Sequence, residues 1–265
     1  MKNFLQLTYI IALFFTIASC TKNKPTIKAF MLPEVINSNF NPTDSSRKHK
    51  EEYISGIFPV FYGKYPFTKQ IDIAKWQTDT TYRSDFFRGY LPDSNYENLD
   101  ATGFELFVDY DQTVFMKTKY HTMGIEYYPV YIVNSTQNDK IFNGKDSHIY
   151  GIQEARYDRS WPNWYPVEAE GVDFCGNGQW KLIVHPNEFV LILMKKYEGN
   201  FETDLRVRLK IGDNILVSKS FIGTIHKGQF RVEKGSYIEG VIEKGHLFEW
   251  FYGTTPLDED YLIKD

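Results

Sequence analysis

The chain contains little cysteine, which limits how its fold can be stabilised. Its 265 residues include two cysteines, Cys20 and Cys175. An exported domain held by disulfides carries an even set of cysteines within its folded part. Cys20 lies near the N-terminus, so we expect no disulfide partner for Cys175. Because Cys175 follows Phe174 and has no histidine near it in sequence, we expect a small buried apolar residue and not a catalytic thiol.

The chain also lacks a basic excess and a long apolar run. Its formal net charge is −4, which gives no electrostatic footprint for nucleic acid. The longest apolar stretch, from Phe4 to Ile17, has about 14 residues, whereas a helix needs about 20 to span a bilayer. These features argue against a nucleic-acid-binding protein and against an ordinary transmembrane helix.

No catalytic or cofactor motif is recognisable. No two of the six histidines lie two or four residues apart, so neither a strand pair nor a metalloprotease helix is predicted. Asp146-Ser147-His148 holds the letters of a catalytic triad, but neighbouring side chains diverge and the segment is typical of a turn. Asp109 and Asp111 share a strand face, although calcium needs more oxygen ligands. We therefore expect no metal, no cofactor and no enzymatic activity.

The first twenty residues have three parts in a fixed order. Lys2 gives a positive start, Phe4 to Ile17 is mostly apolar, and two small residues precede Cys20. This arrangement resembles a bacterial lipoprotein signal peptide with its lipobox. The resemblance implies that residues 1–19 are removed and that Cys20 becomes the first residue, with a diacylglycerol on its sulfur and an acyl chain such as palmitate on its amino group. An ordinary secretory signal with an incidental cysteine is the alternative.

The same resemblance implies a location in the bacterial cell envelope. Cys20 would bind the protein to membrane lipid, because two or more acyl chains give stable anchoring. Thr21 follows the cysteine and no acidic residue lies nearby, which favours the outer membrane under the sorting rules of some bacteria. Residues 20–50 are rich in Asn, Ser, Thr and Pro, and we expect them to form a flexible tether. The alternative for Ala29 to Ile36, which contains several apolar residues, is local packing.

Segments beyond residue 50 have the patterns of strands. Phe201 to Ile211 alternates apolar and polar residues, which is typical of a half-buried antiparallel strand. Phe189 to Met194 is apolar on both faces and predicts a central strand that is covered on both sides. Asn143-Gly144 predicts a turn, and Leu247 to Tyr252 is expected to form a strand or a short helix.

These segments predict an all-β protein built around an antiparallel β-sandwich. Strand count and turn spacing resemble immunoglobulin or fibronectin type III modules, although the Cys–Trp–Cys core of antibody domains is absent. We expect a signal peptide at 1–19, the tether at 20–50, a β-rich N-terminal region at 51–125, the sandwich at 126–231 and a C-terminal extension at 232–265.

Aromatic residues make up 17 % of the chain. Their simplest use is packing between strands. However, Trp161-Pro162-Asn163-Trp164-Tyr165-Pro166 places three large rings in a loop limited by proline. We predict Trp161, Trp164 and Tyr165 as contacts to a ligand or partner, because loops and aromatic side chains supply much of the energy of recognition. The alternative is that these rings fold back and seal the sandwich.

The sequence thus predicts a non-catalytic cell-envelope lipoprotein whose β-sandwich is a binding or structural module. Its expected partner is an envelope protein or a glycan. Binding of a glycan through the aromatic loop is the first alternative, because aromatic rings stack on the flat faces of sugars. An envelope hydrolase is the second, because glycosidase carboxylates are paired in space and not in sequence.

Overall fold

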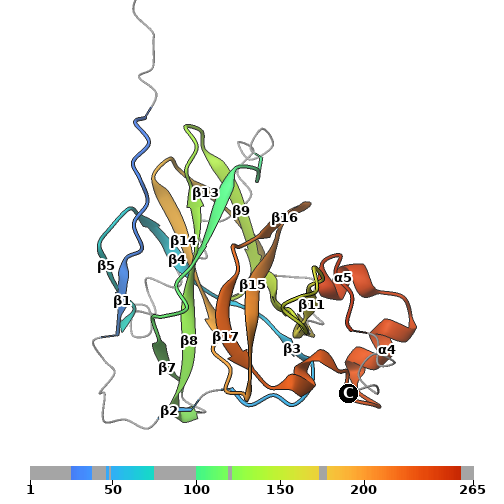
Figure 1. The fold of residues 1–265 in the computed structure, drawn as a ribbon. Coiled ribbons are helices and arrows are strands. Elements are labelled where there is room, and N and C mark those ends of the chain that lie inside the picture. The colour runs from blue at the N-terminus through green and yellow to red at the C-terminus, as the bar shows by residue number, and fades with distance from the viewer. Residues whose placement is uncertain are drawn as a thin grey trace, which may run out of the picture.

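The structure is a computed structural model that describes residues 25–37, 46–47, 49–74, 100–118, 121–172 and 178–257. Two sheets of mostly antiparallel strands pack face to face in it, so the predicted all-β sandwich is confirmed (Figure 1). The predicted signal peptide at 1–19, Cys20 and Cys175 lie outside the described residues. No helix in the described part is long and apolar enough to cross a membrane.

The first sheet is built around β8 (His121–Asn134) and β14 (Glu188–Lys195), which pair antiparallel from Tyr127 to Val133. On the far side of β14 lies β4 (Val60–Pro66). Three further strands pair with β8, namely β2 (Ser46–Arg47), β6 (Phe104–Val108) and β7 (Val114–Thr118). The predicted boundary between residues 125 and 126 falls within β8, and strands from both sides of it share this sheet.

The second sheet is built around the long strand β15 (Phe201–Ile211). One edge of β15 pairs with β10 (Tyr150–Ala155), which continues to the short strand β11 (Tyr165–Pro166). Two further strands pair with β15, β16 (Asn214–Val217) and β17 (Phe221–Ile225).

Smaller pairs and helices complete the domain. The pairs are β1 (Glu34–Ile36) with β5 (Gln70–Asp72), β3 (Ser55–Ile57) with β12 (Glu168–Glu170), and β9 (Lys140–Lys145) with β13 (Gln179–Val184). The C-terminal part holds a 3-10 helix, η2 (Lys227–Phe230), and two short α-helices, α4 (Tyr237–Glu243) and α5 (Leu247–Phe251). The segment predicted as a strand or a short helix from Leu247 is therefore the helix α5.

The main hydrophobic core lies between the two sheets. Its contributors include alternate residues of β15, Val207, Leu209 and Ile211, together with buried residues of β8 and β14. The rings of Tyr128 on β8 and Phe221 on β17 meet across the interface at 5.7 Å between centroids. The half-buried alternation predicted for residues 201–211 is confirmed, because these inward residues are buried while the polar ones between them are only partly covered.

The outer face of the first sheet is covered by the N-terminal segment. Phe30 places its ring centroid 5.0 Å from Phe107, 5.6 Å from Tyr131, 5.4 Å from Phe189 and 5.2 Å from Phe67. The central strand β14 is thus covered on both faces, as its apolar run predicts. Residues 25–37 belong to the range predicted as a tether, and the structure packs them against the domain (Figure 1).

The turn predicted at Asn143-Gly144 is wrong. Both residues lie inside β9 and pair with Lys181 and Trp180 of β13, and the turn comes later, at Asp146 and Ser147. Gly144 has a packing role instead, because a Cβ atom there would lie 2.4 Å from the Trp180 ring. Glycine in a strand often marks such a close approach.

Candidate functional site

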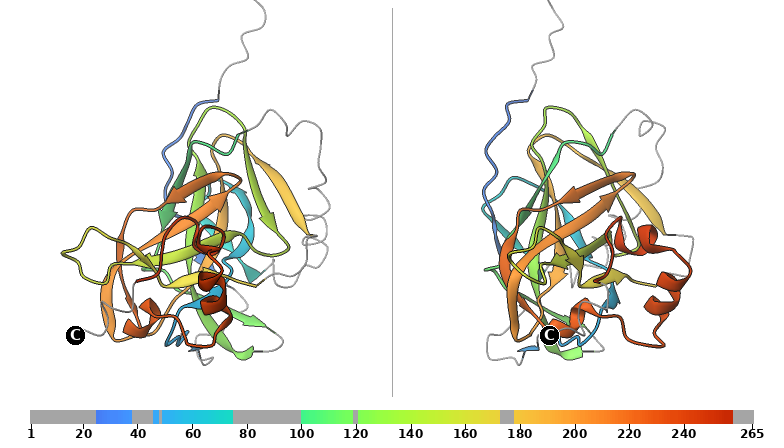
Figure 2. Two further views of the ribbon diagram at one scale, coloured as in Figure 1. Left: turned by 90° about the vertical axis from the view of Figure 1, so that its right-hand side faces the viewer. Right: turned by 45° about the vertical axis from the view of Figure 1, so that its right-hand side comes forward.

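The loop between β10 and β11 carries Trp161 and Trp164, and Tyr165 is the first residue of β11. These are the three aromatic residues that the sequence singles out. Asp158 fixes its first half, because one carboxylate oxygen accepts hydrogen bonds from the backbone N–H and the hydroxyl of Ser160, both at 2.7 Å. These bonds also lower the pKa of Asp158. The side chains of Trp161, Trp164 and Tyr165 are half-buried. The loop projects from the side of the sandwich (Figure 2).

Trp164 lies against two arginine side chains, one from β15 and one from the residue that follows β10. The guanidinium carbon of Arg206 is 4.3 Å from the ring centroid, and that of Arg156 is 5.0 Å away. Such cation–π contacts are worth about 0.5–2 kcal/mol, more where water is excluded. Arg156 is also 3.8 Å from the carboxylate of Asp204. The indole is therefore held by charge and stacking as well as by the loop.

Glu154 binds the side chains of Arg206 and Arg208. Its side chain is fully buried, and its two oxygens accept from Nε of Arg206 at 2.5 Å and Nε of Arg208 at 2.9 Å. Arg208 also donates to the carbonyl oxygen of Tyr252, at the end of α5, at 3.2 Å. The pairing of β10 with β15 sets Glu154 opposite Arg206, so the sheet register itself assembles this cluster.

The other two predicted contacts are divided between packing and exposure. The ring of Tyr165 lies edge-on to Phe230 at 6.5 Å and packs on a small second core cluster. Trp161 lies 6.1 Å from the ring of Tyr157. Tyr165 therefore folds back onto the domain, as the packing alternative describes. Trp161 and Trp164 keep part of their surface in solvent.

We call Arg156, Trp161, Trp164, Tyr165 and Arg206 the aromatic–arginine surface. The sequence predicts the aromatic residues of this surface but not the arginines or Glu154. In the sequence, Arg206 and Arg208 are only polar residues of an alternating strand. Glu154 lies some fifty residues earlier in the chain, so its contact with them is not evident. Tryptophan, tyrosine and arginine are the residues enriched at the energetic centres of protein interfaces. The arrangement can therefore make stacking contacts and charge-assisted hydrogen bonds to a partner.

A groove of about 440 Å³ lies between β6 and the β16–β17 edge. Its lining is mainly apolar, with Glu105 and Lys219 as its charged members. Val217, at its wall, is one of the exposed large apolar residues of the described part. The groove is a second surface feature, without the combination of rings and guanidinium groups that defines the first.

Glu168 is a buried acid that sequence reasoning did not find. Its carboxylate accepts hydrogen bonds from the hydroxyl of Tyr197 at 2.5 Å and from the backbone N–H and side-chain amide of Gln153 at 2.6 and 2.7 Å. Burial raises the pKa of Glu168 to about 7, although these donors and the nearby Lys195 act in the opposite direction. Because the side chain is fully enclosed, we assign it to the interior polar network and not to a contact surface.

The candidate metal ligands do not come together. Among the residues that the structure describes, no group of three or more His, Cys, Asp or Glu side chains could hold a metal ion. The carboxylate of Asp109 accepts hydrogen bonds from the backbone N–H and the side-chain amide of Gln112, at 3.2 and 3.0 Å. Asp146 and His148 lie at the tight turn after β9.

Comparisons of the chain with models of protein families, with curated proteins and with solved structures found no match.

Proposed function

We propose that this chain is a non-catalytic lipoprotein of a bacterial cell envelope. Cys20 carries the lipid and fixes the protein to the membrane, with the outer membrane as the expected location. The β-sandwich binds a second envelope protein through the aromatic–arginine surface. The observation that carries the binding role is the stack of Trp164 with Arg206 and Arg156. Buried Glu154 holds Arg206 in place.

A protein partner fits this surface better than a glycan. A sugar-binding platform needs an open ring face, whereas guanidinium groups lie within 4.3 and 5.0 Å of the centre of the Trp164 ring. Stacked arginine and tryptophan side chains are typical of the central, partly desolvated region of protein interfaces. The loop also presents these side chains at a low entropic cost, because Asp158 and Ser160 already fix its backbone.

Affinity purification of the intact lipoprotein from its native envelope tests the binding role. Wild type is compared with Trp164→Ala, and Val217→Ser in the separate groove serves as the matched surface control. We expect one protein to copurify with wild type and with Val217→Ser and to be lost with Trp164→Ala, because only that change removes the stacked ring. The melting temperature of each variant is measured in parallel.

Two outcomes would contradict the binding role. The first is a Trp164→Ala variant that is less stable but retains the copurifying protein, since this means that the ring serves packing alone. The second is loss of the copurifying protein with Val217→Ser only, which would move the binding site to the groove. Recovery of a glycan in place of a protein would favour the glycan alternative.

A further inference from the structure

The N-terminal segment is bound to one end of the sandwich before it reaches β1. The side-chain oxygen of Asn187 accepts the backbone N–H of Lys28 at 2.7 Å, and its side-chain nitrogen donates to the carbonyl oxygen of Thr26 at 3.0 Å. Further along, the hydroxyl of Tyr131 donates to the carbonyl oxygen of Pro33 at 3.1 Å. The chain is thus held from Thr26 onward.

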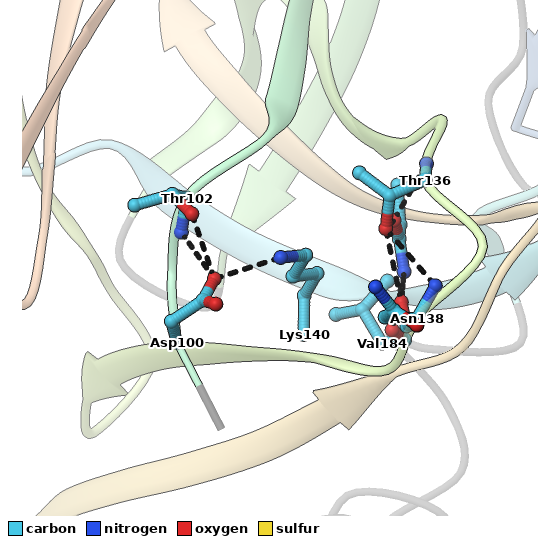
Figure 3. Close-up of polar contacts among 7 residues, drawn as sticks. Asp100, Thr102, Thr136, Asn138, Lys140 and Val184 are labelled. Carbon is cyan, nitrogen blue, oxygen red and sulfur yellow. Dashed lines mark hydrogen bonds and ion pairs between the residues drawn. The ribbon is translucent and has the colours of Figure 1, made fainter. Parts of the chain in front are cut away.

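The turns that receive this segment are themselves fixed. Asn134 lies at the end of β8, and its side-chain nitrogen donates to the carbonyl oxygens of Asn138 and Val184, both at 2.8 Å. The carbonyl oxygen of Asn134 accepts the backbone N–H of Asn187 at 3.3 Å. Figure 3 shows the bonds to Asn138 and Val184 beside the ion pair of Asp100 and Lys140, whose charged atoms are 2.8 Å apart. The β8–β9 and β13–β14 turns therefore form one rigid end.

The ion pair strengthens the same end. The side chain of Lys140 is almost buried, and together with two hydrogen bonds from Thr102 it lowers the pKa of Asp100 to about 2. Asp100 is thus charged at every pH at which a cell envelope works. A fixed charge pair at this point ties the start of β6 to β9, and the end keeps its shape.

The number of residues between this rigid end and Cys20 limits the distance between them. Five Cα–Cα steps separate Cys20 from Pro25, and they span at most about 18 Å whatever their conformation. A tether running from Cys20 to residue 50 would have allowed about 108 Å by the same arithmetic. Docking of residues 25–37 therefore changes a long spacer into a short one.

The side chains near the anchor suit a lipid surface. Lys22, Lys24 and Lys28 place three positive charges within seven residues, and each basic residue near an anionic membrane contributes about 1 kcal/mol of attraction. Met31 and Leu32 follow, with 74 % and 48 % of their surface exposed. Exposed apolar residues beside basic ones are typical of peripheral contact with a bilayer.

We propose that the end of the sandwich formed by the β8–β9 and β13–β14 turns rests at the surface of the phospholipid bilayer that holds the anchor. This inference rests on the proposed lipidation of Cys20. It gives the domain one orientation, with the turn end at the membrane and α4 at the opposite end (Figure 1). The loop between β10 and β11, which carries Trp161 and Trp164, then projects sideways, parallel to the membrane (Figure 2).

Fluorescence quenching in vesicles tests this orientation. The mature lipidated protein, in a Cys175→Ser background, carries a fluorophore at Gln137→Cys in the β8–β9 turn or at Lys234→Cys before α4; Gln137 and Lys234 are both exposed in the native chain. The eight residues of β14 between these ends correspond to about 26 Å. Vesicles of anionic phospholipid contain a lipid with a quencher on its headgroup. We expect severalfold stronger quenching at position 137 than at position 234.

A second variant separates docking from chance proximity. Asn187 has a φ of 62°, which glycine adopts without strain, so Asn187→Gly removes both hydrogen bonds to the segment and keeps the turn. The free length from Cys20 to Phe30 then rises to about 36 Å. Quenching at position 137 should fall severalfold toward the value at position 234.

Each outcome has one meaning. Equal quenching at the two positions in protein that floats with the vesicles overturns the orientation and leaves the lipoprotein assignment intact. Quenching at position 137 that Asn187→Gly does not change overturns the role of docking. Protein isolated from the native cells that lacks the lipid and does not float overturns the proposed function, and this inference fails with it.

Discussion

Replacing Glu154 with alanine is expected to lower the free energy of unfolding by about 3–5 kcal/mol, because breaking a buried ion pair from one side leaves uncompensated charge. Glu154 is fully buried, and its partners Arg206 and Arg208 keep 20 % and 16 % of their side-chain surface exposed. Removal of the carboxylate takes away the acceptor that Arg206 and Arg208 share. Equilibrium unfolding in urea, followed by tryptophan fluorescence, measures the change.

The matched control for Glu154 is Glu202→Gln on the neighbouring strand. Glu202 pairs with Arg159 at 3.3 Å, and both side chains are about half exposed or more. Exposed pairs contribute about 0–1 kcal/mol, so this variant should unfold almost as wild type does. A loss below about 1 kcal/mol for Glu154→Ala would contradict the view that the carboxylate holds the aromatic–arginine surface together.

Phe30→Ala is expected to cost about 3 kcal/mol, the lower end of the range for buried phenylalanine because the ring is only partly buried. Phe30 packs against the rings of Phe107, Tyr131 and Phe189 on the outer face of the first sheet. The truncation removes these contacts and opens that face to water. Thermal and urea unfolding of the mature domain provide the measurement.

Met31→Ala is the control for Phe30, because Met31 is the next residue and 74 % of its surface is exposed. It should leave the stability unchanged within about 0.5 kcal/mol. If Phe30→Ala behaves in the same way, residues 25–37 are a spacer and do not belong to the fold. That result would also remove the basis for a fixed orientation at the membrane.

Strands with a strong local pattern could be predicted from the sequence. Phe201 to Ile211 alternates at every position, so its buried and half-covered faces follow from the period of a strand alone. Phe189 to Met194 is apolar throughout and indicates burial on both faces, yet it does not say what covers them. Phe30 supplies one cover from 159 residues away. The apolar residues of its own segment, from Ala29 to Ile36, are compatible with packing but do not say against which strand.

The turn predicted at Asn143-Gly144 shows why local chemistry was insufficient in one place. Asn-Gly is a strong turn dipeptide in isolation, but Trp180 on the neighbouring strand needs the space above Gly144. The glycine therefore serves tertiary packing, and the chain turns at Asp146 and Ser147 instead. A single sequence does not reveal which of these two uses a glycine has.

The candidate site was predicted in part for a similar reason. Trp161, Trp164 and Tyr165 lie within five residues of one another, and two prolines lie in the same short segment, so the sequence alone indicates a candidate contact loop. Glu154 and Arg206 become neighbours only through the register between β10 and β15. Charges on separate strands cannot be assigned to one cluster until that register is known, so the arginines that hold Trp164 stay hidden in the sequence.

The proposed lipid anchor and the bound N-terminal segment would together hold the protein close to a membrane, with the aromatic–arginine surface facing a neighbour in the same plane. The proposed orientation would limit the partners to envelope proteins that extend a similar short distance from the bilayer. In this account Cys20 anchors the protein in the membrane and residues 25–37 set its orientation. Trp164 and the neighbouring arginines contact the partner.

The anchor is tested most directly by comparing wild type with Cys20→Ser in the native cell, using fractionation and intact-mass measurement. The account predicts a wild-type protein in the membrane fraction that begins at Cys20 and carries a diacylglycerol and an amino-terminal acyl chain. It predicts that Cys20→Ser is soluble or keeps its signal peptide. A Cys20→Ser protein that is cleaved and still bound to the membrane would contradict the account.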